Sequence, residues 1–450
     1  MSSKQNNAVN KLALEYVHPS TLIADPRNPR LHKPPQVAAI ARSISTFGFN
    51  VPVVADGDGL ITAGHGRVAA AIKLGLDTIP VLRIHHLNAE QRQAFMIADN
   101  RLTDTSQWDD RLLGEVLRDL TLVDLDFELD AIGFSVGEID MKIEALGIGG
   151  ETDDLDQDAA ILVDGPAITQ PGDLWLLGQH RLLCGDALER QAWETLMNGA
   201  KAQMTFADVP YNIPVRGFVS GLGKVQHREF AMASGEMNRD QFTTFLTNAF
   251  GQMAAHSVPG ALSYVCLDWR HQGEMIAAGE SAFTKLTNMC VWVKPSGSMG
   301  SMYRSQYELI YVWKSGRGRH KNNVELGRNG RNRCNIWNYP AISGFRYSEG
   351  GDLLADHPTS KPVRLIADAI LDCTARGDII VDPFCGGGST LIAAQRVGRI
   401  CHAIEIDPHY SDATLRRYEA LTGEEPLLEE TGETFTAVMA RRSNQAEERT

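Results

Sequence analysis

The stretch from Ile379 to Thr390 limits what this chain can fold into more than any other part of the sequence. It reads Ile-Ile-Val-Asp-Pro-Phe-Cys-Gly-Gly-Gly-Ser-Thr, so residues that favour a buried strand run directly into a glycine turn. An apolar helix is expected from Leu391 to Val397, and a second strand, with Glu405 near its end, from Ile400 to Ile406. Strand, glycine turn, helix, strand and acid form half of a nucleotide-type α/β site, in which the acid binds ribose hydroxyls. A glycine-rich turn can also be a purely structural turn without a ligand, so the surrounding sequence has to decide between a nucleotide-type site and a simple turn.

Composition narrows the classes of protein to consider. With 450 residues the chain is long enough for two or three domains, and a hydrophobic share of 43% suits buried cores. No long apolar run is present, which predicts no membrane span, and residues 1–10 lack a signal-peptide core. The seven cysteines include no Cys-x-x-Cys pair, so no metal site and no disulfide framework are expected, and a cytoplasmic location fits. The net charge of −13 argues against a uniformly basic nucleic-acid binder.

An acidic stretch divides the chain. Between residues 124 and 158 twelve acids face a single base, Lys142, and Gly147, Gly149 and Gly150 follow, a pattern typical of a solvated linker. The predicted parts are an N-terminal domain over 11–146, a linker over 147–165, a second domain over 166–425, and a polar tail over 426–450 that we expect to be disordered.

Three short motifs lie in the first domain. They are Asn-Pro-Arg at 28–30, Gly-Phe-x-x-Pro-Val at 48–53, and Gly-His-Gly-Arg at 64–67, the last one leading into an expected helix. Through these motifs the chain resembles, roughly from Leu12 to Leu102, the ParB-like domain of partition proteins.

The third motif is the informative one. In the ParB-like family it reads Gly-Glu-x-Arg and contacts phosphate at a helix start, so the resemblance implies a phosphate or nucleotide site at Gly64, His65 and Arg67. His65 stands where the family carries an acid, which argues against nucleotide hydrolysis. The alternative is that Arg67 only braces a small fold.

A tight loop in the second domain carries the kinds of residue that methyl transfer to an amino nitrogen requires. The expected strand Met204–Ala207 is followed at once by Asp208, Val209, Pro210 and Tyr211. An exocyclic amino group of a base is a poor nucleophile, so a site must accept hydrogen bonds from both of its protons. The Asp208 carboxylate and the Val209 carbonyl are two acceptors, and Pro210 restricts Val209 to extended backbone. Tyr211 offers a face on which an extruded base stacks.

A basic segment follows in an otherwise acidic chain. Between Lys314 and about residue 356 the sequence is rich in arginine, glycine and asparagine, which favours contact with phosphates and base edges. A solvated surface loop is the alternative. The candidate DNA-binding residues are Arg317, Arg319, Lys321, Arg328, Arg331 and Arg333.

The order of these features resembles one enzyme family. The Asp-x-Pro-Tyr loop, the basic segment, a His-Pro-Thr-x-Lys-Pro motif at 357–362, the glycine turn and the terminal acid follow one another from Gly172 to Tyr418. This is the β-type arrangement of S-adenosylmethionine-dependent DNA amino-methyltransferases. Val209 departs from the family motif, which has proline there, but its carbonyl remains.

The resemblance implies a fold, a cofactor and a substrate. The fold is a Rossmann-like class I methyltransferase with a doubly wound mixed sheet, joined to a smaller ParB-like α/β domain. The substrate is double-stranded DNA, and an acid at position 208 favours adenine N6 over cytosine N4. Residues implied to bind S-adenosyl-L-methionine are Asp186, Thr359, Lys361, Asp382, Phe384, Gly386, Gly388, Ser389, Thr390 and Glu405, with Thr359 and Lys361 near the methionine carboxylate.

Several alternatives stay open at this point. Cytosine N4 is the second target, and methylation of RNA or protein is a third reading of the same loop. The chain could also be a ParB-like DNA-binding regulator with an inactive methyltransferase half. A restriction–modification or prophage setting comes from the resemblance alone, and the sequence leaves a homodimer open.

Overall fold

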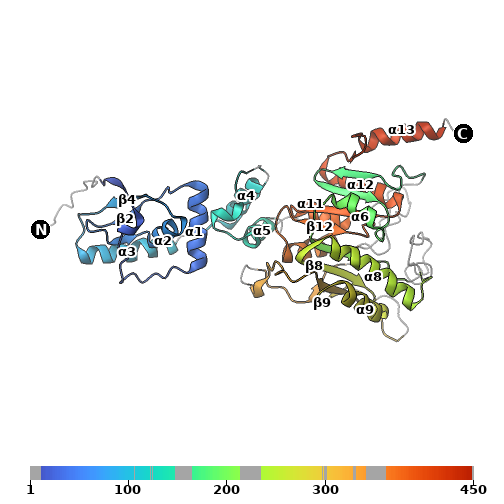
Figure 1. The fold of residues 1–450 in the computed structure, drawn as a ribbon, viewed down its shortest axis with the longest axis horizontal. Coiled ribbons are helices and arrows are strands. Elements are labelled where there is room, and N and C mark those ends of the chain that lie inside the picture. The colour runs from blue at the N-terminus through green and yellow to red at the C-terminus, as the bar shows by residue number, and fades with distance from the viewer. Residues whose placement is uncertain are drawn as a thin grey trace. The chain divides into compact units, whose positions relative to one another are not determined.

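The chain folds into two compact units, Met1–Gly149 and Gly150–Thr450 (Figure 1). The computed structural model describes residues 12–105, 107–121, 123, 125–146, 165–212, 235–295, 297, 302–327, 331–340 and 361–447. Most of the expected linker lies outside these residues. None of the helices in the described part is long and apolar enough to cross a membrane.

The first unit is a small α/β domain built on a four-stranded sheet with the order β1-β4-β2-β3. Its core consists of short β-branched and small residues from the sheet and α2, among them Val53, Ile61, Val68 and Val81. Its elements are β1 (Leu14–Val17), α1 (Pro34–Phe47), β2 (Val53–Ala55), β3 (Ile61–Ala63), α2 (His65–Leu74), β4 (Ile79–Arg83), α3 (Ala89–Asp104), α4 (Asp110–Thr121) and α5 (Val136–Ala145), with 3-10 turns at Pro19–Thr21 and Leu129–Ile132.

The second unit is built on a ten-stranded mixed sheet with the order β11-β9-β10-β8-β7-β12-β13-β6-β5-β14. Strands β8, β7, β12, β13 and β6 run parallel in its middle, and antiparallel pairs begin at β10 and β5. Its strands are β5 (Leu174–Leu177), β6 (His180–Cys184), β7 (Ala202–Asp208), β8 (Ser257–Leu267), β9 (Lys285–Val293), β10 (Tyr307–Lys314), β11 (Ile336–Asn338), β12 (Ile379–Asp382), β13 (Ile400–Glu405) and β14 (Leu427–Leu428). Its helices are α6 (Arg190–Met197), α8 (Arg239–Ala255), α9 (Gln272–Ala282), α10 (Val363–Cys373), α11 (Ser389–Arg396), α12 (Pro408–Thr422) and α13 (Phe435–Glu447), with 3-10 turns at Trp269–His271 and Glu325–Gly327.

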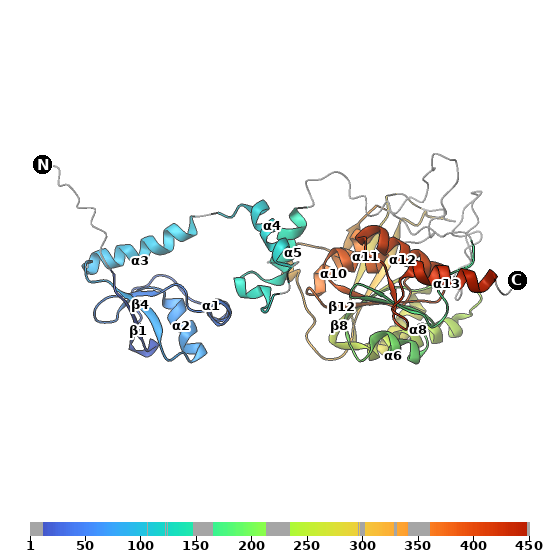
Figure 2. The same cartoon turned by 90° about the horizontal axis from the view of Figure 1, so that it is seen from above.

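Helices cover both faces of this sheet. Because side chains alternate along a strand, Met204 and Phe206 of β7 enter the core with α10, α11 and α12, whereas Ala207 enters the core with α6, α8 and α9. Figure 2 shows the two groups of helices on opposite sides of the strands. The predicted fold class, a doubly wound mixed sheet with a smaller α/β domain, is confirmed.

The tail expected to be disordered over 426–450 is instead ordered as far as residue 447. Strand β14 pairs with β5, and α13 follows it. Phe435 packs edge-on against Trp175, with 5.5 Å between ring centroids, and Val438 is fully buried. The prediction of disorder failed because it rested on the polar composition of the tail. The few apolar side chains of the tail pack against the edge of the sheet at β5, and composition does not reveal such a contact.

Candidate active site

Four strand ends bring the predicted site residues of the second unit to one edge of the sheet. Strands β7 and β12 are neighbours, and the chain order reverses between them, which is the position at which α/β sheets of this kind bind ligands. Asp208 ends β7 and Asp382 ends β12. Glu405 ends β13 beside β6, and its carbonyl accepts a hydrogen bond from the Gly185 amide, next to Asp186.

The glycine turn after β12 is held by hydrogen bonds from two directions. Asp382 accepts from the amide of Phe384 at 3.0 Å, and Glu405 accepts from the amide of Gly386 at 2.6 Å. Helix α12 braces the other side, because Thr414 donates to the Gly386 carbonyl and Arg417 to the Gly387 carbonyl. These hydrogen bonds fix the shape of the turn, and Glu405 faces it.

Gly388 shows why glycine is required at the end of this turn. Its φ of +80° lies in the left-handed region, where it precedes α11. A Cβ at this position would lie 2.8 Å from the side chain of Thr414. Any larger residue would thus both strain the backbone and push α12 away from the turn.

Two buried acids frame the turn and hold protons more tightly than usual. Burial raises the pKa of Asp382 to about 7, although hydrogen bonds from Thr390 and the Phe384 amide oppose the shift. Burial likewise raises the pKa of Glu405 to about 7, against hydrogen bonds from the amides of Asp407 and Gly386. Glu405 is 7% exposed. The two hydroxyls of a ribose bound beside the turn would therefore form hydrogen bonds with this carboxyl group with little competition from water.

The loop after β7 presents Asp208 and holds its neighbours in place. The side chain of Asp208 is 22% exposed, whereas Val209 is buried in the core under α8. Asn212 has a φ of +52°, and its side chain accepts from the amides of Gly235 and Met237 and donates to the Met237 carbonyl. Asn212 thereby anchors the loop to the residues before α8, a role that the sequence analysis did not assign.

A cluster of charges surrounds the Asp208 carboxylate. The Lys361 ammonium lies 2.6 Å from Asp208 Oδ2 and 3.1 Å from Glu308 Oε2. The Tyr211 hydroxyl lies 3.0 Å from Asp208 Oδ1 and 3.0 Å from Glu308 Oε2. Lys294, which follows the end of β9, forms an ion pair with Glu308. The sequence analysis did not assign Glu308 to the site, although a charged residue in an otherwise apolar strand is a signal for a buried functional acid.

The pKa shifts in this cluster follow from burial and from the two lysines. Burial raises the pKa of Asp208, and the Lys361 ammonium offsets part of that shift. Burial acts on Glu308 in the same direction, but Lys361 and Lys294 together lower its pKa to about 2. The two carboxylates raise the pKa of Lys361 despite its burial, so this lysine is charged.

Among the remaining predicted site residues, some belong to the glycine turn, one contacts the Asp208 loop, and two lie outside the described residues. Phe384, Ser389 and Thr390 belong to the turn or to the first residues of α11. Lys361, assigned by resemblance to the donor carboxylate, contacts the catalytic loop in this structure, with its side chain 2% exposed. The two outside the described residues are Thr359, implied for the cofactor, and Arg328, predicted for DNA.

Comparisons with known proteins identify both units. A family model described as DNA methylase, of the N6/N4 type, matches residues 202–416. Type II methyltransferase M2.MboI of Moraxella bovis is 31% identical over 145 residues, 31% of this chain and 51% of that protein. The ParB-like nuclease domain-containing protein YnaK of Escherichia coli (strain K12) is 42% identical over 83 residues, 18% of this chain and 95% of that protein.

The N-terminal region therefore carries a ParB-like domain, and the second unit carries a domain that matches the N6/N4 DNA methylase family model. Both resemblances drawn from the motifs are thereby confirmed. The chain spans about half the length of the first relative and nearly all of the second.

Solved structures of similar proteins include two methyltransferases. One is titled PvuII DNA methyltransferase (cytosine-N4-specific), with a TM-score of 0.42 at 15% identity, covering 58% of this chain and 93% of that chain. The other is an M1.HpyAVI–SAM complex, with a TM-score of 0.39 at 17% identity, covering 52% of this chain and 97% of that chain.

The first residues of the basic segment, 315–319, lie at the opposite end of the sheet from Asp208. Strand β10 runs antiparallel to β8, so the residues after Lys314 return to the start of β8, where the Ser315 carbonyl accepts from the Gly260 amide. Asp208 instead pairs with Cys266, which is six residues beyond Gly260 along β8. At the usual rise per residue, Gly260 and Cys266 are about 20 Å apart. Arg317 and Arg319 are exposed at this far end, and their contact with DNA stays a prediction.

Three other basic residues of the segment form ion pairs with acids of the methylase domain itself. Lys321 pairs with Asp378 at 2.6 Å, before β12. Arg331 reaches Asp368 and Asp372 of α10, each at 3.0 Å, and its side chain is only 4% exposed. Arg333 contacts the same two acids at 3.1 and 2.8 Å. Arg331 and Arg333 thus both have acidic partners within their own domain, and their contact with DNA stays a prediction.

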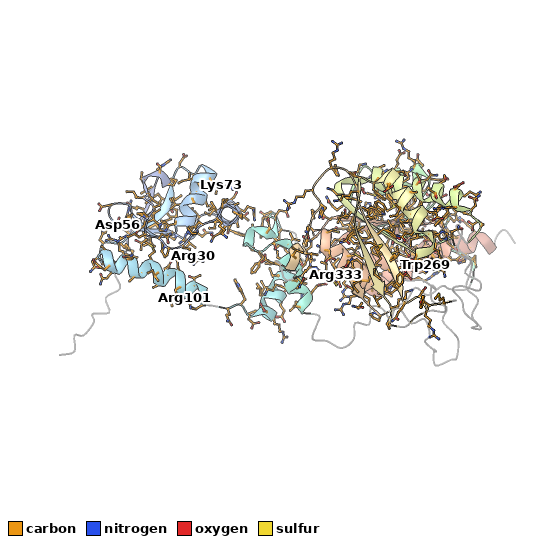
Figure 3. All side chains as sticks on the ribbon, turned by 90° about the horizontal axis from the view of Figure 1, so that it is seen from below. Arg30, Asp56, Lys73, Arg101, Trp269 and Arg333 are labelled. Atoms are coloured by element: carbon orange, nitrogen blue, oxygen red, sulfur yellow. The ribbon has the colours of Figure 1, made fainter. Side chains whose placement is uncertain are left out.

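Exposed aromatic side chains lie at the edge of the sheet where Asp208 lies. Trp269 follows the end of β8 and is 48% exposed, and Tyr307 begins β10 and is 42% exposed. The register places them together, because Leu267 pairs with Leu309. Arg270 stacks over Trp269, with 5.3 Å from its guanidinium carbon to the ring centroid. Figure 3 shows Trp269 well apart from Arg333 within this unit.

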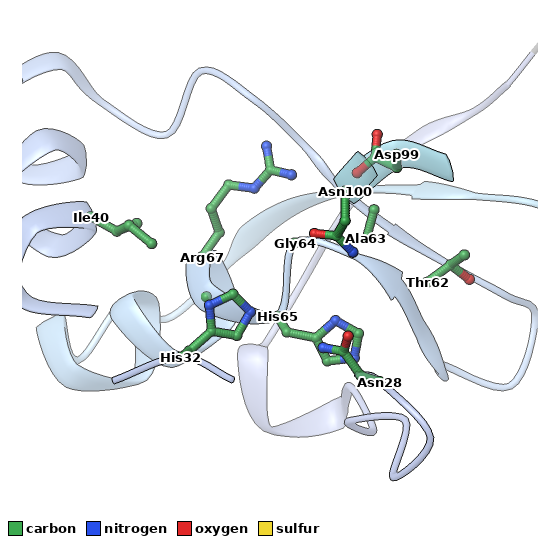
Figure 4. A pocket seen from close by; sticks show the side chains of 11 residues that line it. Asn28, His32, Ile40, Thr62, Ala63, Gly64, His65, Arg67, Asp99 and Asn100 are labelled. Carbon is green, nitrogen blue, oxygen red and sulfur yellow. The ribbon is translucent and has the colours of Figure 1, made fainter. Parts of the chain in front are cut away.

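The ParB-like domain has a cavity of about 160 Å³ at the start of α2 (Figure 4). Gly64, with a φ of +101°, precedes the helix, and Arg67 of its first turn lines the cavity and donates to the Val51 carbonyl at 3.2 Å. His65 accepts from the Asp25 amide at 3.3 Å, and burial lowers the pKa of His65, an effect that His32 reinforces. The structure therefore brings the three predicted residues to one cavity. Its lining is Asn28, His32, Ile40, Thr62, Ala63, Gly64, His65, Gly66, Arg67, Asp99 and Asn100.

The buried arginine pairs lead to a stability prediction. Arg331→Met leaves Asp368 and Asp372 with one cation fewer in a nearly water-free position, so the free energy of unfolding of the methylase domain should fall by about 3 kcal/mol. Urea denaturation followed by tryptophan fluorescence measures it, since six of the seven tryptophans lie in this unit.

The exposed Arg317→Met serves as its matched control and should change stability by less than about 0.5 kcal/mol. An Arg331→Met variant that is as stable as the control, but has lost affinity for DNA, would support the DNA-binding assignment instead.

Proposed function

We propose that the chain transfers a methyl group from S-adenosyl-L-methionine to an exocyclic amino nitrogen of a base in double-stranded DNA. The observation that carries the proposal is the adjacency of two loops. The partly exposed carboxylate of Asp208 and the aromatic side chain of Tyr211 follow β7, and the glycine turn with Glu405 follows the neighbouring β12 and β13. An acceptor for amino protons thus stands beside a turn suited to a nucleoside-like donor.

Each group has a definite part in this reaction. Glu405 accepts hydrogen bonds from the ribose hydroxyls, and the amides of the turn approach the methionine portion of the donor. Asp208 and the Val209 carbonyl accept the two amino protons of the base. As the nitrogen–methyl bond forms, the sulfur–methyl bond breaks, the sulfonium becomes a neutral thioether, and the nitrogen releases one proton for which Asp208 is an acceptor. The loop accelerates the transfer mainly by positioning.

Adenine N6 is the target that we propose, with cytosine N4 as the alternative. The support is the family resemblance, in which an acid rather than serine at position 208 favours adenine N6. Digestion of methylated DNA to nucleosides, followed by mass spectrometry, separates N6-methyladenine from N4-methylcytosine.

Asp208 is expected to act in the transition state rather than in donor binding. Asp208→Ala should lower kcat by at least about 100-fold while the donor affinity, measured by calorimetry with S-adenosyl-L-methionine, stays within about threefold. Glu405→Ala should behave in the opposite way, with a donor affinity lowered at least about tenfold, because the ribose acceptor is gone. A folded Asp208→Ala chain with normal turnover would exclude the mechanism, and unchanged donor affinity in Glu405→Ala would exclude the donor site.

DNA is proposed to approach the edge at which Asp208, Trp269 and Tyr307 lie. Exposed aromatic rings next to a base-accepting loop suit stacking on, or wedging beside, a displaced base. The exposed Arg270 adds a cation at the same edge. The arginines at the other end of the sheet would then contact DNA only if the duplex extended around the domain.

Single alanine variants distinguish these two surfaces. Trp269→Ala and Tyr307→Ala should each weaken binding to a duplex, measured by fluorescence anisotropy at fixed salt, by about 1–3 kcal/mol, the usual value of a lost base–aromatic stack. Arg319→Ala, at the far end of the sheet, is the control and should bind nearly as the unmodified chain does. The reverse pattern would return DNA recognition to the basic segment.

A second candidate function is favoured by the cavity of the ParB-like domain. We propose that it binds the phosphate groups of a nucleotide, with Arg67 as the cation and the amides at the start of α2 as donors. The half-buried position of Arg67 supports this, because burial lowers its pKa and the group gains from an anionic partner.

Arg67→Ala should therefore lower nucleotide affinity at least about tenfold, measured by calorimetry with each of the four ribonucleoside triphosphates. Lys73→Ala, an exposed cation in the last turn of the same helix, is the control and should have no effect beyond about twofold. Absence of binding by the unmodified chain, to any triphosphate or to inorganic phosphate, would leave Arg67 as a structural residue.

A further inference from the structure

Glu308 is a buried acid of the site to which the proposed reaction assigns no part. It lies at the second position of β10, and its side chain is 13% exposed. Two groups bridge it to Asp208, the Lys361 ammonium and the Tyr211 hydroxyl, which are themselves 3.2 Å apart. The four side chains form a closed ring of contacts in which each carboxylate faces the same two donors.

The charges of this ring nearly cancel. Asp208 and Glu308 supply two negative charges, and Lys361 and Lys294 supply two positive ones. Lys294 contacts Glu308, whereas Lys361 is divided between the two acids, at 2.6 Å from Asp208 and 3.1 Å from Glu308. Without the charge of Glu308, two ammonium groups would remain for one carboxylate, and Lys361 would pair with Asp208 alone.

That pairing matters because of what Asp208 must do. A carboxylate that is fully paired with an ammonium is a weaker acceptor for the amino protons of a base, since the cation already neutralises its charge. The Tyr211 hydroxyl has the same choice of acceptor, with equal distances of 3.0 Å to the two acids. Glu308 offers both donors an alternative that lies away from the reacting group.

We propose that Glu308 is a positioning residue for methyl transfer, which draws Lys361 and the Tyr211 hydroxyl toward itself and so keeps Asp208 able to accept the amino protons of the base. The proposal rests on the proposed function. It assigns Glu308 no contact with the donor or with DNA, so its effect should fall on the chemical step.

The test compares Glu308→Gln, which keeps the shape and removes the charge, with the unmodified full-length chain. In single-turnover assays with tritiated donor and duplex DNA, the rate of transfer should fall about 10- to 100-fold, as is usual for a residue that orients another functional group. The KM values and the donor affinity from calorimetry should stay within about twofold. Glu308→Asp restores the charge and should recover part of the rate.

Glu274→Gln is the matched control. Glu274 is also a buried acid with a cationic partner, Arg239, but it lies on α9, away from the ring of contacts. Its rate of transfer should equal that of the unmodified chain, which shows that loss of a buried carboxylate is not by itself enough to slow the reaction.

The outcomes separate this proposal from the one on which it rests. An unmodified chain that methylates DNA, together with an unchanged rate in Glu308→Gln, overturns the role of Glu308 alone. Equal losses in Glu308→Gln and Glu308→Asp, or raised KM values without a change in rate, also overturn it. If Glu308→Gln does not fold, as judged by circular dichroism, Glu308→Asp decides: a lowered rate with normal KM values supports the proposal, and a normal rate overturns it. An unmodified chain that methylates no DNA overturns both proposals.

Discussion

The parallel pairing of β7 with β12 is the constraint on which the rest of the site depends. Ile380 lies opposite Met204 and Val381 opposite Thr205, in the interior of the sheet, where both faces are covered by helices. Since parallel strands end at the same edge, this register fixes the loop of Asp208 beside the glycine turn. The two loops come from segments about 170 residues apart in the sequence, and no local interaction could bring them together.

Buried charge is the cost of this arrangement, and the structure offsets it by pairing. Lys361 would be strongly unfavourable at 2% exposure without the two carboxylates that it contacts. The acids that the basic segment contacts are also paired, since Asp368 and Asp372 form ion pairs with Arg331 and Arg333. One set of pairs lies at the proposed reaction centre, and the other fastens a connecting segment to α10. The same residue types thus serve chemistry at one end of the sheet and stability at the other.

The basic segment shows where reasoning from composition fails. A run of arginines among glycines and asparagines is typical of a nucleic-acid contact, and for the exposed Arg317 and Arg319 that prediction still stands. For Arg331 the partners are acids 37 and 41 residues further along the chain, on a helix whose own pattern indicates only an apolar face. Charge counts along a sequence do not show which charges will be paired with one another, because that depends on packing.

The sequence by itself determined the two-part α/β architecture, the strand–turn–helix of the glycine motif and the loop that carries Asp208, because periodicity and turn chemistry are properties of neighbouring residues. Only the tertiary structure decided that Lys361 contacts Asp208, 153 residues away, that Glu308 lies against Tyr211 across 97 residues, and that the tail covers β5. Contacts of this kind follow from strand order and register. A residue can be recognised as charged or apolar from its place in the chain, but its partner is set by the sheet that brings distant segments to one edge.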